Sequence, residues 1–142
     1  MATFTFFHEF RGSLGLSILN LDTATHKWAL TNTAPTAGTD DELADITQIA
    51  NANGYTTGGT TAANSAWAET GAGTGVWRFT ADDTVFTASG GSIGPFRYAV
   101  LYDDTSTGDK LIGYLDYGTA LTITDGNTFT IDVGASGIFE LS

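Results

Sequence analysis

Alternation of apolar and polar residues dominates the second half of the chain and predicts β-strands. Residues 76–81 alternate between two faces, one of which carries Trp77 and Phe79. Further strands are predicted at residues 26–32, 65–70, 85–88, 97–102, 111–117 and 138–141, separated by turns rich in Gly, Asp, Asn and Ser. Short strands at a spacing of roughly 8–12 residues indicate a mainly β fold, an antiparallel β-sandwich of jelly-roll or immunoglobulin-like type.

The first apolar segment, residues 4–21, fits two patterns. Apolar residues at positions 7, 10, 14, 18 and 21 follow one face of a helix, whereas positions 14, 16 and 18 alternate as in a strand. Gly12 and Gly15 weaken a helix, so both alternatives stay open. This segment is rich in phenylalanine and precedes the predicted strands, so we treat residues 1–25 as an N-terminal arm or first element.

One short helix is predicted at Asp40–Ala50. Asp40 or Asp41 can serve as its N-cap, and apolar residues follow at positions 43, 46 and 49. The segment Asn51–Gly54, which favours left-handed backbone conformations, would end the helix. Residues 26–142 are then a single β-sandwich domain that includes this helix.

The last predicted hairpin surrounds Asp125–Asn127. A two-residue turn would place the apolar residues of its two strands on opposite faces of the sheet. A three-residue loop would instead pair Ile123 with Phe129 and Leu121 with Ile131, which brings both apolar sets to one face. The pattern therefore predicts a three-residue loop.

Charge and composition exclude several classes of function. The chain has 142 residues, the size of one domain, and its 16 acidic and 5 basic residues give a net charge of -11. A strongly negative chain is a poor ligand for nucleic acid or for an anionic membrane surface. Cysteine is absent, which excludes disulfides and thiolate chemistry. No secretory signal and no apolar run of about 18 residues is present, so we expect no membrane-spanning helix.

Candidate catalytic residues are few, and we expect no enzyme. Only His8 and His26 could take part in a Ser–His–Asp triad, and no serine lies in a nucleophile-elbow motif. The acidic pairs Asp40–Asp41, Asp82–Asp83 and Asp103–Asp104 lie in turns, and neighbouring side chains of an extended chain point apart. They therefore do not form the paired carboxylates of a glycosidase.

A cation site is the remaining chemical candidate. The segment from Asp103 to Gly108 begins like a calcium loop, but Tyr114 stands where an EF-hand needs a bidentate glutamate. A looser site of Asp103, Asp104 and Asp109 stays open beside the alternative of a solvated acidic loop. We expect no cofactor.

Five blocks of the chain together suggest a family. They are WALTNTAP at 28–35, ADITQIA at 44–50, NGYTTGG at 53–59, the segment 86–104 and the segment 111–118. In order and spacing over residues 26–142 they resemble a family of small virion proteins of tailed bacteriophages, which are head decoration or tail-associated proteins. The resemblance implies a structural role without an enzymatic site, and the first 25 residues depart from it.

The resemblance leads to the hypothesis of a capsid decoration, or cement, protein. It would bind the outer surface of the major capsid protein lattice, because a negative chain is repelled by packaged DNA. A homo-oligomer, by resemblance a trimer, is expected. Phe4, Phe6, Phe7 and Phe10 on the N-terminal arm are predicted to contact another subunit or the capsid.

Two alternatives belong to other classes. A tail or fibre module could recognise host-surface glycans through exposed aromatic side chains, for which Tyr102 and Tyr117 near strand ends are candidates. A small hydrolase would need a cleft with convergent catalytic groups, which cannot be assembled from the sequence.

Overall fold

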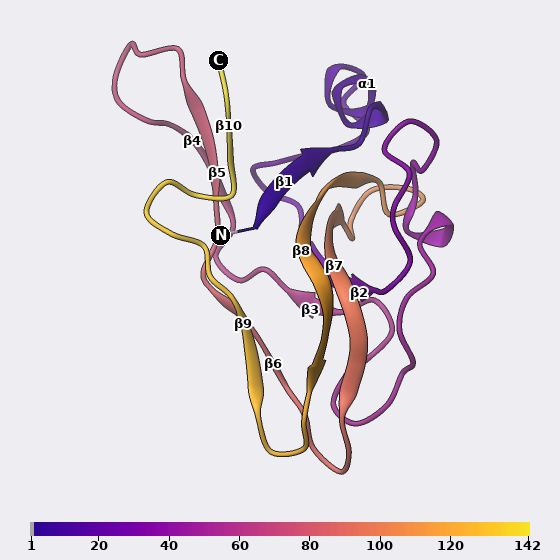
Figure 1. The fold of residues 1–142 in the computed structure, drawn as a ribbon. Helices are drawn as coiled ribbons and strands as arrows, with labels where there is room; N and C mark the ends of the chain where they lie inside the picture. The colour runs from indigo at the N-terminus through magenta and orange to yellow at the C-terminus, as the bar shows by residue number, and fades with distance from the viewer. Residues whose placement is uncertain (1) are drawn as a thin grey trace.

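Three antiparallel sheets and one short α-helix make up residues 2–142, the part of the chain that the computed structural model describes (Figure 1). The elements in chain order are β1 (Thr3–Phe6), α1 (Glu9–Gly15), β2 (His26–Thr31), the single 3-10 turn η1 (Leu43–Asp45), β3 (Thr60–Thr61), β4 (Ala66–Glu69), β5 (Trp77–Thr80), β6 (Thr84–Thr87), β7 (Ile93–Asp103), β8 (Leu111–Ile123), β9 (Thr128–Ile131) and β10 (Phe139–Leu141). The mainly β class predicted from the apolar pattern is therefore confirmed.

The sheets pack in two layers. One layer is the five-stranded sheet β1-β8-β7-β2-β3, and the other holds the three-stranded sheet β10-β5-β4 and the two-stranded sheet β6-β9. Both layers contribute to one buried cluster, which includes Trp28, Leu30, Leu101, Leu115, Phe79, Phe86, Ile131 and Phe139. Residues 2–142 thus form a sandwich of antiparallel sheets that do not close into a barrel.

The five-stranded sheet is also covered on its outer face. Ala29, Val100 and Tyr102 belong to a second buried cluster on that side, together with Phe7, which follows β1, and Ile46, which follows η1. Strands that are buried on both faces have nearly continuous apolar sequences instead of alternating ones. This explains the uninterrupted apolar runs of β2 and β7.

β6 leads into β7, and β8 leads into β9, so that the four strands form one ribbon of two paired chain segments. This ribbon bends from one layer into the other. β7 pairs with β8 in the large sheet, and β6 pairs with β9 in the second layer. The two turns lie side by side at the bottom of Figure 1. There the Ala88 N–H donates to the Asn127 carbonyl (2.9 Å), and the Gly126 N–H donates to the Ala88 carbonyl (2.9 Å).

The hairpin predicted around Asp125–Asn127 is wrong in its pairing. Ile123 lies opposite Ile93 of β7, and Phe129 lies opposite Phe86 of β6. The turn between β8 and β9 is a four-residue turn, closed by a hydrogen bond (3.0 Å) between its first and last residues. The prediction assumed that the two strands on either side of this turn pair with each other, whereas β8 pairs with the strand before it, β7, and β9 pairs with β6.

The helix predicted at Asp40–Ala50 is wrong beyond one short turn. Only η1 is helical there, and its N-cap is Glu42. Gln48 then forms a β-bridge with the last residue of β2, and the Ile49 N–H donates to the carbonyl of the β2 residue before it (3.1 Å). This segment carries β-branched residues, which suit an extended chain beside β2 better than a longer helix.

Of the two descriptions given for residues 1–25, an arm or a first element, the described residues (Met1 lies outside them) agree with a first element that packs within the sandwich. β1 is an edge strand of the large sheet and pairs antiparallel with β8. α1 follows, and the segment that leads from it to β2 buries Leu19 and Leu21. The alternation at positions 14, 16 and 18 forms no strand. The helix covers only Glu9–Gly15, the strand of this segment lies before it at Thr3–Phe6, and apolar side chains of both join the main core.

Candidate functional site

The four phenylalanines predicted to contact a partner pack within this chain. Phe7 and Phe10 are wholly buried (0% and 1% exposed), so the prediction that they face another molecule is wrong. Phe4 and Phe6 are half-buried, and their rings pack against Phe139 with centroid distances of 5.5 and 5.0 Å. Residues 4 and 6 share one face of β1, and that face is turned toward the sandwich.

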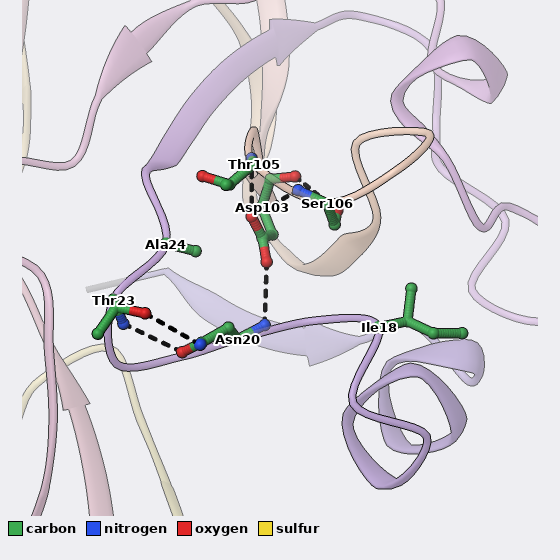
Figure 2. Close-up of a pocket in the computed structure, with 7 residues that line it drawn as sticks. All are labelled: Ile18, Asn20, Thr23, Ala24, Asp103, Thr105 and Ser106. Carbon is green, nitrogen blue, oxygen red and sulfur yellow. Dashed lines mark hydrogen bonds between the residues drawn. The ribbon is translucent and has the colours of Figure 1, made fainter.

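Asp103, the first candidate for a cation site, fastens the loop between β7 and β8 (Figure 2). Its carboxylate is buried, and Oδ1 accepts hydrogen bonds from the N–H groups of Thr105 (2.8 Å) and Ser106 (3.0 Å). Oδ2 accepts a hydrogen bond from the Asn20 N–H (3.0 Å), on the segment that leads into β2. Three backbone donors therefore occupy this carboxylate, beside a shallow hollow of about 120 Å³.

The carboxylates of Asp104 and Asp109 do not join Asp103 around a common point. Asp104 Oδ2 pairs with Lys27 Nζ at 3.0 Å. Burial, and next the negative charge of Asp104, raises the pKa of Asp109. No group of three or more His, Asp or Glu side chains within residues 2–142 is arranged to hold a metal ion. The loop is thus a hydrogen-bonded turn with one ion pair to β2.

His26 makes a contact with a serine that resembles part of a catalytic triad. Its Nδ1 lies 3.0 Å from Ser65 Oγ, and its Nε2 lies 2.9 Å from the Asn20 carbonyl oxygen. Because a carbonyl only accepts, Nε2 carries the proton and the Ser65 hydroxyl donates to Nδ1. The ring is 0% exposed and packs edge-on against Phe79 (4.8 Å). A substrate cannot reach the buried ring. The role of His26 is structural, because its two hydrogen bonds join the segment before β2 to the segment before β4.

We expect the stability of the fold to fall as the pH drops below 6.5, because burial lowers the pKa of His26 from that value. The unfolded chain then binds a proton on this side chain at a higher pH than the folded chain does. The contribution of neutral His26 is complete above pH 6.5 and is lost as the pH falls through the folded-state pKa. Urea denaturation at pH values from about 8 to about 5 measures this loss.

The matched variants separate His26 from other groups in that pH range. His26→Gln should flatten the profile of the unfolding midpoint against pH, although it lowers stability overall. His8→Gln, at an exposed histidine, should leave the profile unchanged. A midpoint that stays constant in the unsubstituted chain over this range would contradict the prediction.

The loop after η1 is attached to β2 and β7 by the side chains of two buried tyrosines and a half-buried glutamine. The Tyr55 hydroxyl accepts a hydrogen bond from the Leu30 N–H (3.0 Å) and donates one to Gln48 Oε1 (2.7 Å). The same Gln48 oxygen accepts a hydrogen bond from the Gly58 N–H (2.7 Å), and the Tyr102 hydroxyl donates to the Gly58 carbonyl (2.6 Å). Sequence reasoning missed Gln48, because a lone glutamine in an amphipathic segment is typical of an exposed position. Tyr102, a candidate for an exposed aromatic, is instead 0% exposed.

Tyr55→Phe should lower the free energy of unfolding by about 1–3 kcal/mol, because the buried Leu30 N–H and the Gln48 side chain would each lose a hydrogen-bond partner. Urea denaturation of the variant measures the loss. Tyr117→Phe is the matched control. Tyr117 is also shielded from solvent, which raises its pKa to about 12, but its hydroxyl forms no hydrogen bond with the described residues. Equal losses in the two variants would refute a stabilising role of the network.

The few basic side chains are almost all matched to a partner. Four of the five basic residues form ion pairs. These pairs are Lys27 with Asp104, Arg78 with Glu140, Arg97 with Asp116, and Lys110 with both Asp41 and Glu42. The fifth, Arg11, lies over the Phe6 ring at 5.5 Å. Several other acidic side chains accept hydrogen bonds from loop N–H groups, among them Asp40, Asp45, Glu69, Asp83 and Asp125. The surplus of negative charge is thus spread over the loops.

Two tryptophans mark an exposed apolar surface at the β4–β5 hairpin. Trp77 is 42% exposed, and its ring stacks on that of Trp67 at 5.9 Å. Trp67 also borders a hollow of about 220 Å³, whose other walls are Leu14, Ser17, Leu19, Asn20, Leu21 and Asp22. Leu16 and Ile18, on the same segment between α1 and β2, are 74% and 43% exposed. The hollow therefore lies between β4 and a segment that exposes apolar side chains.

Comparison with known proteins supplies no relative of this chain. It matches no protein-family model, no curated protein and no solved structure. No helix within residues 2–142 is long and apolar enough to cross a membrane. The assignment of a function therefore rests on the residues and surfaces described above.

Proposed function

We propose that the chain is a structural protein of a tailed-bacteriophage particle, and within it a capsid decoration protein. It binds the outer surface of the major capsid protein lattice and stabilises the head. The proposal assigns the chain no catalytic activity, no cofactor and no nucleic-acid partner. The observation that carries it is the ordered set of sequence blocks that resemble the virion family, between residues 28 and 118.

The positions of these blocks in the fold support their use as a family signature. The block 28–35 includes most of β2, which pairs with β7 from the block 86–104. The block 111–118 begins β8, which pairs with β7 on the other side. Gln48 and Tyr55, from the remaining two blocks, form the hydrogen bonds that hold the loop against β2. A chain that shares these blocks should share the centre of this sandwich.

The charge distribution supports the outer surface as the location. The chain carries a net charge of -11, and its basic side chains are already engaged within the molecule. Such a surface is repelled by packaged DNA inside the head. A homo-oligomer, with three copies as the expectation from the resemblance, remains part of the proposal.

Binding to heads that lack the protein tests the proposal. The purified chain, added to such heads, should co-sediment with them at a fixed ratio, and electron cryomicroscopy should show it on the outer surface. Coated heads should withstand a higher temperature than bare ones. Density at the tail alone, or no co-sedimentation, would overturn the proposed function.

A glycan-binding module of the tail or fibre is the second candidate. The exposed Trp77 ring, stacked on Trp67, favours it, because aromatic faces with one wet side are common in recognition sites. This candidate predicts binding of the isolated chain to an array of bacterial surface glycans, with the binding lost in Trp77→Ala. Absence of glycan binding would eliminate it.

A further inference from the structure

The three-stranded sheet ends in an open edge at β4. β4 pairs with β5 on one side, and no strand of residues 2–142 lies along its other side. Figure 1 shows the β4–β5 hairpin extending beyond the other sheets at the upper left. Outside the β4–β5 ladder, no backbone hydrogen bond joins Ala66–Glu69 to another described segment. A strand in this position presents unpaired N–H and C=O groups.

The register identifies the backbone groups that face this edge. Thr70 and Val76 form a hydrogen-bonded pair, in which the Thr70 N–H donates to the Val76 carbonyl (2.8 Å). Hydrogen-bonded and non-hydrogen-bonded pairs alternate along an antiparallel ladder. Trp67 lies opposite Phe79, and Glu69 lies opposite Trp77, so both pairs are of the non-hydrogen-bonded kind. The backbone groups of Trp67 and Glu69 therefore point away from β5, toward the open edge.

A hydrogen bond on the far side of β5 agrees with this assignment. The Phe79 carbonyl accepts a hydrogen bond from the Ile138 N–H (2.8 Å), directly before β10. Phe79 thus directs its backbone toward β10 and not toward β4. Its partner Trp67 must direct its own backbone outward.

The hollow beside Trp67 would receive a side chain of an added strand. A residue opposite Trp67 on such a strand would place its side chain on the same face as the indole ring, about 5 Å away. On that face Trp67 borders the hollow of about 220 Å³, which also has Leu14, Leu19 and Leu21 in its walls. Trp67 and the three leucines form an apolar part of the wall, against which an apolar side chain fits, while Ser17, Asn20 and Asp22 form a polar part.

Charge restricts the partner further. Glu69 follows Trp67 by two residues and so lies on the same face of β4. Its carboxylate accepts hydrogen bonds from the Gly73 and Gly75 N–H groups (3.2 and 2.7 Å) and has no basic partner within residues 2–142. Asp22 lies at the hollow. Two copies of this chain, each with a net charge of -11, repel each other, whereas a cationic segment is attracted.

We propose that the β4 edge binds an extended segment of another protein as a fourth strand. The segment carries an apolar residue that enters the hollow beside Trp67, and a Lys or Arg two positions away that lies next to Glu69. Backbone hydrogen bonds then supply affinity and the hollow supplies specificity. Ala66 and Ala68, which are exposed on the other face, are too small to obstruct a new strand. The inference rests on the proposed function, under which the segment belongs to the major capsid protein.

A proline substitution tests the edge. Glu69→Pro removes an N–H that points outward, so it breaks no hydrogen bond of the β4–β5 ladder. Glu69→Gln is the matched control, which keeps the N–H and one acceptor oxygen for the Gly75 N–H, and removes the charge and the acceptor of the Gly73 N–H. Glu69→Pro should weaken binding to heads that lack the protein by about tenfold or more, and Glu69→Gln should weaken it less. Binding by Glu69→Pro at full strength would overturn the inference.

Hydrogen exchange of the full chain gives a second measurement that does not depend on a variant. In the free chain the amides of Trp67 and Glu69 should exchange rapidly, and the amide of Ala68, which donates to β5, should exchange slowly. Both edge amides should become protected when the chain is bound to heads. Rapid exchange of both in the bound chain would overturn the inference and leave the proposed function standing.

Two other outcomes have distinct meanings. Failure of the unsubstituted chain to bind heads would overturn the proposed function, and with it the partner named here. Protection of the edge amides that rises with the concentration of the free chain would show that a second copy occupies the edge. That result would overturn the assignment to a cationic segment.

Discussion

Gly59→Ala should prevent the chain from folding, or lower its free energy of unfolding by more than about 4 kcal/mol. Gly59 has φ of +77°, and a Cβ atom there would overlap the carbonyl oxygen of Trp28. Trp28 lies in β2, a central strand with neighbours on both sides, so its backbone cannot move away without breaking ladder bonds. A loss of this size is a large part of the roughly 5–15 kcal/mol that stabilises an ordinary domain.

Gly73→Ala is the matched control for this prediction. Gly73 has nearly the same φ, +76°, but apart from its chain neighbours no heavy atom of residues 2–142 lies within 4 Å of a Cβ placed there. Only the backbone strain remains, which costs about 1 kcal/mol. Circular dichroism and urea denaturation compare the two variants. Similar stabilities in both would show that β2 yields to the added carbon, contrary to the packing described here.

Phe139→Ala should lower the free energy of unfolding by about 3–5 kcal/mol. The ring of Phe139 is 7% exposed and contacts rings from four other segments, those of Phe4, Phe6, Phe10, Trp67 and Phe79. Its loss would leave a cavity where β1, α1, β4 and β5 meet β10. Amide exchange should therefore accelerate first in β1, whose two phenylalanines pack on this ring.

Val85→Ala is the control for Phe139→Ala, since Val85 also lies on a strand but is 47% exposed. It should change stability by about 0.5 kcal/mol or less. Urea denaturation measures both variants, and hydrogen exchange locates the effect. A loss below about 1 kcal/mol in Phe139→Ala would show that the aromatic cluster collapses around the missing ring.

The same packing changes how a truncation of the first segment would be interpreted. Deleting residues 2–10 removes Phe7 and Phe10 from the core as well as the strand β1. A loss of binding to heads in that deletion would therefore report unfolding and not a lost contact. Substitutions at the exposed Leu16 and Ile18 examine the surface without this complication.

Strand positions were predictable because the period of two is a local property of the sequence. The alternation around Phe79 and the apolar runs of residues 26–32 and 97–102 correspond to β5, β2 and β7. Acidity and the absence of cysteine are also properties of the sequence alone. None of these properties specifies which strands become neighbours.

Pairing and burial were decided by the tertiary structure. Ile123 and Phe129 flank a turn that suggests a hairpin, yet Ile123 pairs with Ile93 of β7 and Phe129 with Phe86 of β6. Segment 40–50 has a helical spacing of apolar residues, yet β2 offers it backbone and side-chain partners that a helix would forgo. In both cases the alternative that buries more groups with satisfied hydrogen bonds prevails over the local pattern.

The candidate sites show the same division. The sequence identified Asp103 as a notable acidic residue. Two of its N–H donors, Thr105 and Ser106, are local, but only the fold brings the Asn20 N–H to its carboxylate. The sequence also identified the phenylalanines at positions 4–10 as an apolar cluster, but not Phe139 as their partner. Composition and local period thus determined a small acidic β chain. The tertiary structure alone determined which groups are buried and which edge is open, because burial depends on contacts between residues that are distant in sequence.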